Sequence, residues 1–266
     1  MNGKDTKAFE MTILRLVLSG TIGLLLPGYL LSRLLKIKGW ELAPSTFMLS
    51  TISVFYSILI LAYSPLTANF ASVSAFLATL SITLLFYLRH KKIRLWEHAI
   101  ESEPKTVETS VLFIAAPFAI LILLRSWMQP MISPDSIFRW QHLAELVFNG
   151  ASLSFYPPST ADDFLIYPYP DGFPPLASII YSALYIYAGK IIPSLSSVIV
   201  LLQFTACLYY VYHASQTLFG RSSAAISLLS LLLSTTLFFS LFLGQETGWT
   251  AVSAAGFFYY AAKNEK

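Results

Sequence analysis

Long apolar runs alternate with short polar connections along this chain of 266 residues. A helix that crosses a membrane needs about 20 mainly apolar residues. Runs of that kind predict helices at 12–34, 44–64, 66–88, 109–128, 192–213 and 222–243, with a shorter helix at 247–262. The pattern therefore predicts an all-α fold, a polytopic membrane bundle of about seven transmembrane helices.

Composition supports an integral membrane protein of the cell or cytoplasmic membrane. Hydrophobic residues make up 56% of the chain and charged residues only 12%, against about 25% charged in soluble domains. The formal net charge is +3, and the basic residues lie in short clusters beside apolar runs, so nucleic acid is not an expected partner. The single cysteine, Cys207, excludes an internal disulfide and any cysteine-based metal motif.

The basic clusters predict the orientation, because short cytoplasmic loops are enriched in lysine and arginine. Two clusters follow the first and third predicted spans and are assigned to the cytoplasm: Arg33, Lys36 and Lys38, then Arg89, Lys91, Lys92 and Arg94. The uncharged connection "AYSPLTAN" and the segment 129–172, in which Arg139 is the sole Lys or Arg, are then extracytoplasmic.

The segment "FPPLASIIYSALYIYAG" at 173–189 is apolar, but it has only 17 residues and opens with two prolines. If it does not cross, Arg221, Lys263 and Lys266 all face the cytoplasm and Lys190 alone is left outside. We therefore expect it to dip into, or lie along, the outer leaflet as a juxtamembrane hairpin.

The stretch "SPDSIFRWQHLAELVFNG" at 133–150 is amphipathic when drawn as a helix. Ser133 suits the N-cap and Pro134 the first helical position. The predicted apolar side holds Leu143, Val147, Trp140, Ala144, Ile137 and Phe148, and the polar side holds Asp135, Arg139, His142, Glu145, Gln141 and Asn149. We expect an interfacial helix with its apolar face among lipid headgroups.

An acidic, proline-rich stretch follows, "ASLSFYPPSTADDFLIYPYPDGFPPL". Prolines at this density hold the backbone in extended or turned conformations. The stretch carries Asp162, Asp163 and Asp171 among tyrosines. Long ordered loops usually carry function, so this outer loop is the expected site.

Several motifs in this order resemble membrane glycosyltransferases of the GT-C superfamily, of the protein mannosyltransferase and aminoarabinose transferase type. They are "PD", then "RW" on the interfacial helix, "FYPPS", "YPYPDGFPPL" and a span ending "LFGRSSAA", preceded by "LLLPGYLLSRLL". The resemblance implies an N-terminal three-helix region at 1–108. A GT-C-like core would occupy 109–266, with a first core helix, an outer loop at 129–191 and three further helices. Relatives have more helices beyond this point, so we expect the chain to be a truncated N-terminal portion.

The resemblance also implies a reaction. A sugar would move from a polyprenyl-phosphate donor to an acceptor hydroxyl on a lipid, glycan or protein, with Asp135 as general base. Arg139 and Arg125 are candidate cations for the leaving phosphate, and Glu246 is a second acidic candidate. The substrate-binding candidates are Arg125, His142, Tyr167, Tyr169 and Asp171. A divalent cation, Mg²⁺ or Mn²⁺, would find oxygen ligands in Asp162, Asp163 and Glu246.

Each candidate also has a structural interpretation. Asp135 can interact with the positive end of its own helix, Asp162, Asp163 and Asp171 suit turns, and Arg125 can extend to the interface from within a span. His142 can be a solvated helix residue, Glu246 can begin the last span, and the tyrosines can pack the loop. A non-catalytic scaffold or subunit, using the same outer loop to bind a partner, is the alternative function.

Overall fold

In the computed structural model, helices are the regular secondary structure of the residues that it describes, and turns and irregular segments connect them. These are 20, 23–64, 66–95, 113, 116–118, 120–121, 124–125, 128, 136–150, 152–169, 175–234 and 246–264. The chain forms two compact units, Met1–Ala99 with Phe138–Ile192, and Ile100–Ile137 with Pro193–Lys266. The predicted all-α class is confirmed.

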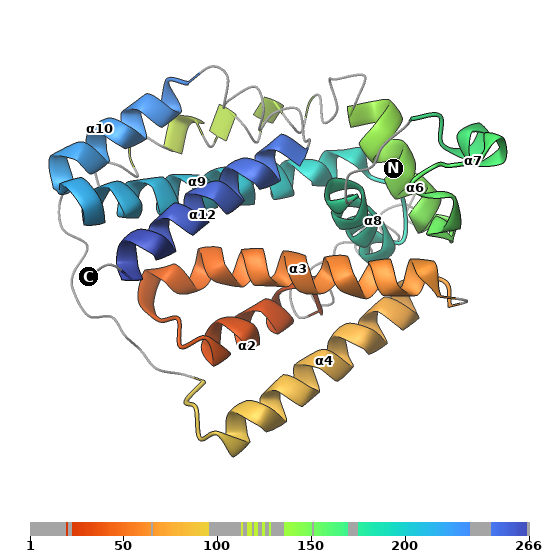
Figure 1. The fold of residues 1–266 in the computed structure, drawn as a ribbon, viewed down its shortest axis with the longest axis horizontal. Helices are drawn as coiled ribbons and strands as arrows, with labels where there is room; N and C mark the ends of the chain where they lie inside the picture. The colour runs from red at the N-terminus through yellow and green to blue at the C-terminus, as the bar shows by residue number, and fades with distance from the viewer. Residues whose placement is uncertain are drawn as a thin grey trace, which may run out of the picture. The chain divides into compact units, whose positions relative to one another are not determined.

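The first unit is built around α3 (Leu42–Tyr63), a helix of 22 residues that is about 33 Å long. The helices α2 (Leu26–Leu34) and α4 (Phe70–His90) both pack against it (Figure 1). Asn69 caps α4, because its side-chain oxygen accepts hydrogen bonds from the backbone N–H groups of Ala71 and Ser72 at 2.9 and 3.0 Å. The uncharged connection between α3 and α4 thus ends in a capped helix start.

From Phe138 onward, the outer loop also belongs to the first unit. It consists of a π-helical turn η3 (Ser136–Gln141), α6 (His142–Phe148), a short η4 (Leu153–Phe155), α7 (Ala161–Ile166) and α8 (Leu176–Ala188). The α6 helix packs against α8, and both η4 and α8 pack against α3. Three residues on the predicted apolar side, Leu143, Ala144 and Val147, are fully buried. This face therefore packs against protein, where the sequence predicted lipid headgroups.

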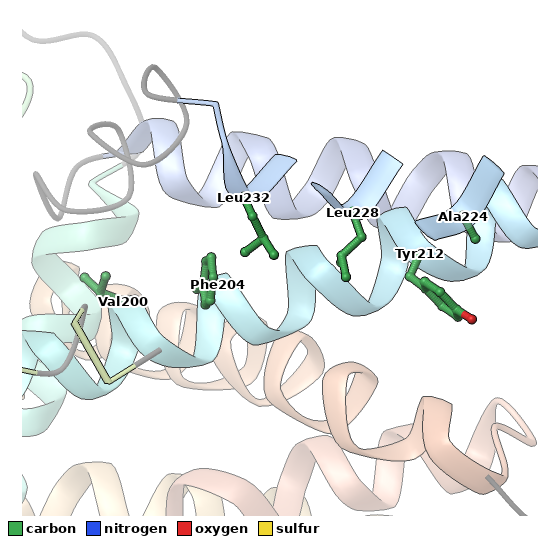
Figure 2. Close-up of a cluster of buried hydrophobic side chains, with 6 residues drawn as sticks. All are labelled: Val200, Phe204, Tyr212, Ala224, Leu228 and Leu232. Carbon is green, nitrogen blue, oxygen red and sulfur yellow. The ribbon is translucent and has the colours of Figure 1, made fainter. Parts of the chain in front are cut away.

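The second unit centres on α9 (Ser196–Phe219), with α10 (Arg221–Leu232) and α12 (Glu246–Asn264) packed against it. Residues at intervals of four form the contact between α9 and α10, since such residues share one helix face. Figure 2 shows the cluster, with Val200, Phe204 and Tyr212 from α9 and Ala224, Leu228 and Leu232 from α10. All six side chains are buried.

The prediction of about seven membrane spans is wrong for the part of the chain that the structure describes. Three helices there are long and apolar enough to cross a membrane: Gly39–Tyr63, Phe70–His90 and Pro193–Phe219. The α12 helix has 19 residues but is too polar to qualify, and α10 has only 12. Most of the predicted span 109–128, and parts of those at 12–34 and 222–243, lie outside the described residues.

The segment expected to lie along the outer leaflet is a short core helix. With 13 residues, α8 is about 20 Å long, whereas crossing the hydrocarbon needs about 30 Å. Every residue from Ala177 to Ala188 is buried, as is usual for a helix that is apolar on all sides. Gly189 ends the helix in the left-handed conformation at φ 74°.

Candidate functional site

The outer loop is fastened to the end of α3 by two hydrogen bonds. The hydroxyl of Tyr63 donates to the backbone oxygen of Tyr156 at 2.7 Å, and the hydroxyl of Ser152 donates to that of Ala62 at 3.1 Å. Both contacts join the loop to the end of α3 that leads into the uncharged connection. The structure therefore puts the two segments that the charge pattern assigned to the outer face at the same end of the first unit.

Tyr167 forms the centre of an aromatic cluster in this loop, and its side chain is fully buried. Its ring lies 5.6 Å from that of Tyr156 and 5.5 Å from that of Tyr169, measured between centroids. The imidazole of His142 is parallel to it within 7°, at 6.4 Å. The proline-rich stretch and the amphipathic helix thus bring three predicted substrate-binding residues together: His142, Tyr167 and Tyr169.

Arg139 extends this cluster with a positive charge. Its guanidinium carbon lies 5.0 Å from the ring centroid of Trp140 and 5.7 Å from that of Tyr169. Both distances are within the range of a cation–π interaction. Trp140 is buried and Arg139 is half-buried, so the cation has a defined position beside the tyrosines.

The helix that packs against α6 carries a buried phenol, which was not predicted from the sequence as a site residue. The hydroxyl of Tyr185, on α8, is buried without a hydrogen-bond partner among the described residues. Burial, and secondly the nearby carboxylate of Glu145, raises the pKa of Tyr185 above its ordinary value. Glu145 in turn accepts a hydrogen bond of 2.8 Å from the side-chain amide of Gln141. The four-residue spacing of Tyr181 and Tyr185 in "YSALYIY" is the sequence feature that could have indicated a tyrosine on the buried face of this helix.

Asp163, a predicted metal ligand, caps α7. Its carboxylate accepts backbone hydrogen bonds from Ser159 at 3.1 Å and Thr160 at 2.8 Å, while the Thr160 hydroxyl accepts from the Asp163 backbone. Hydrogen bonds to this carboxylate, first from the Thr160 side chain and then from the backbone N–H groups of Ser159 and Thr160, lower the pKa of Asp163. Asp162 is exposed on the same turn. Among the described residues there is no group of three or more His, Cys, Asp or Glu side chains that could hold a metal ion.

Four predicted site residues remain: Asp135, Asp171, Arg125 and Glu246. Asp135 and Asp171 lie outside the described residues. Arg125 and Glu246 belong to the second unit. Arg125 is exposed, and Glu246 is the half-buried first residue of α12.

Comparison with protein-family models, curated proteins and solved structures finds no match to this chain. The resemblance to GT-C enzymes rests on the quoted motifs.

Proposed function

We propose that this protein is an integral membrane glycosyltransferase. It moves a sugar from a polyprenyl-phosphate donor to an acceptor hydroxyl at the extracytoplasmic face. The observation that carries the proposal is the half-buried Arg139 between Trp140 and Tyr169, on a loop fastened to the end of a helix of membrane-crossing length. A fixed cation beside aromatic rings suits a substrate with a phosphate at one end and a sugar ring at the other.

The chemistry is a single displacement. The acceptor oxygen forms a bond to the anomeric carbon while the bond from that carbon to the phosphate oxygen breaks. The polyprenyl phosphate leaves with the electron pair, and Asp135 takes the acceptor proton. Arg139 stabilises the charge that develops on the leaving phosphate. Tyr169 offers a ring for the sugar, and buried Tyr167 holds Tyr169 and His142 in position.

The test uses membranes that contain the full chain, supplied with sugar-labelled polyprenyl-phosphate-mannose or polyprenyl-phosphate-aminoarabinose. Label should enter the acceptor fraction as polyprenyl phosphate is released, and Asp135→Asn should abolish both signals at an unchanged amount of protein. Glu103→Gln makes the same charge change in the loop predicted to be cytoplasmic and serves as the control. Full activity of Asp135→Asn, or no transfer from either donor by the unsubstituted chain, would contradict the proposal.

A specific observation supports a second candidate, a non-catalytic subunit that binds a partner. On α7, the apolar side chains of Phe164, Leu165 and Ile166 are 39%, 84% and 46% exposed. Exposed apolar residues on a fixed loop suit a protein contact. A photocrosslinking residue at position 165 that captures one defined membrane protein, together with an unaffected Asp135→Asn variant, would favour this function over transfer.

A further inference from the structure

Two loops at the other end of the first unit share a sequence pattern. The stretch "SRLLKIKGW" at 32–40 and the stretch "LRHKKIRLW" at 88–96 both read Arg, two residues, Lys, Ile, a basic residue, one residue and Trp. The first follows α2 and the second follows α4. Their equivalent pairs are Arg33 and Arg89, Lys36 and Lys92, Ile37 and Ile93, and Lys38 and Arg94.

The two helix ends also have the same backbone geometry. Lys36 and Lys92 both adopt the left-handed conformation, with φ of 60° and 54°, at the position where glycine is usual. The hydrogen bonds correspond one to one at 3.0 Å: Lys36 N–H to Arg33 O, Ile37 N–H to Ser32 O, Lys92 N–H to Arg89 O, and Ile93 N–H to Leu88 O. Lysine thus occupies an unfavourable conformation twice, in a motif that glycine would form more easily.

The two ends are held side by side. Arg33 is only 3% exposed, and its guanidinium donates hydrogen bonds to the backbone oxygens of Ile37 at 3.2 Å and Arg94 at 2.6 Å. The hydroxyl of Tyr29 donates to the backbone oxygen of Leu95 at 2.6 Å. Leu30, Leu84 and Leu88 form the apolar contact between α2 and α4. We call residues 33–38 and 89–94 the twin basic caps.

The caps combine positive charge with exposed apolar side chains. They hold Arg33, Lys36, Lys38, Arg89, Lys91, Lys92 and Arg94, and no acidic residue. Around them Leu35, Trp40 and Phe86 are 62%, 69% and 68% exposed, and the ammonium of Lys91 lies 5.7 Å from the ring centroid of Tyr87. Exposed aromatic residues beside basic ones are typical of a membrane–water interface.

We propose that the twin basic caps bind the phosphate headgroup of an anionic phospholipid in the cytoplasmic leaflet. Basic clusters at the cytoplasmic ends of membrane helices attract anionic lipid. The left-handed lysines would place two ammonium groups at matched positions on two adjoining helix ends. The apolar side chains around them accommodate the acyl chains. The arrangement does not depend on sugar transfer, because it lies at the opposite end of α3 from the outer loop.

The experiment measures lipid binding by native mass spectrometry of the purified full chain. The protein is titrated in neutral detergent with phosphatidylglycerol or with phosphatidylcholine. We expect tighter binding of phosphatidylglycerol, and a loss of about fivefold in affinity for each lysine removed, hence about 25-fold for Lys36→Gln with Lys92→Gln. Glycerol phosphate without acyl chains should not compete at the same concentration.

Two further variants make the result specific. Lys36→Gly with Lys92→Gly removes the same charges from residues whose left-handed backbone glycine adopts readily, and it should lose binding equally. Lys190→Gln with Lys263→Gln removes two charges elsewhere and should retain it. Equal affinity of the unsubstituted chain for both lipids, an equal loss in the Lys190 and Lys263 control, or full competition by glycerol phosphate would overturn the proposal.

Discussion

The hydroxyl of Tyr63, the last residue of α3, donates a hydrogen bond of 2.7 Å to the backbone oxygen of Tyr156. This single contact connects residues 93 positions apart. It joins a helix of membrane-crossing length to the loop that carries the aromatic cluster. The position of the cluster therefore depends on a contact that neither segment specifies alone.

Tyr63→Phe removes that donor and leaves the ring in place. We expect the loop to be less stable by about 1 kcal/mol, so backbone amides at 152–169 should exchange with solvent about fivefold faster. Hydrogen exchange read by mass spectrometry checks this. Tyr56→Phe alters an exposed tyrosine of the same helix and should leave exchange at 152–169 unchanged. Equal rates in both variants would mean that this bond does not hold the loop.

Arg139→Lys keeps the positive charge but loses the planar group that lies beside Trp140 and Tyr169. We expect a loss of about 1 kcal/mol of cation–π stabilisation and a decrease of about fivefold in kcat/KM for sugar transfer. Steady-state kinetics with the labelled donors measure it. Arg221→Lys, at the exposed start of α10, is the matched control, and equal kinetics for the two variants would contradict a role for the guanidinium.

Gly28→Ala tests the close approach of α2 to α3. A methyl group at Gly28 would meet the backbone oxygen of Thr46, the backbone nitrogen of Ser50 and the Ser50 hydroxyl. Because backbone cannot move aside easily, the helices must separate, at a cost of about 1–3 kcal/mol. A lower melting temperature in detergent is expected. Gly20→Ala should not lower it, since a methyl group there meets nothing within 4 Å. An unchanged melting temperature for Gly28→Ala would contradict this packing.

Asp163 makes the N-terminal end of α7 sensitive to acid. Hydrogen bonds from Thr160 and Ser159 lower its pKa in the folded chain, so the ionised carboxylate contributes to the stability of this helix end. The contribution is fully present above the unfolded pKa of about 3.9 and is lost as pH falls through the lower folded pKa. Relative to the intrinsic exchange rate of an unprotected amide at the same pH, exchange of the Ser159 and Thr160 amides should therefore accelerate as pH falls below about 4.

Asp163→Asn cannot titrate and should abolish this extra acceleration, whereas Asp162→Asn should keep it. Hydrogen exchange at several pH values measures both variants. If the acceleration persisted in Asp163→Asn, another group would be responsible for it.

The described helices show how much of the fold the local apolar pattern predicted. The apolar runs were sufficient to predict α3, α4 and α9 as long helices, because burial in lipid or protein requires the same composition along the whole segment. The same runs overestimated the number of spans. The burial of α8 from Ala177 to Ala188 depends on α3 and α6, which are distant in sequence.

The sequence alone determined the helical class, the apolar side of α6 and the charge difference between the two ends of the first unit, since each follows from residues near one another in the chain. Only the tertiary structure decided that His142, Tyr156, Tyr167 and Tyr169 form one cluster and that Arg33 joins two basic loops. A proline-rich stretch has no periodicity from which ring positions follow. Contacts such as Arg33 to Arg94, 61 positions apart, arise from packing between helices.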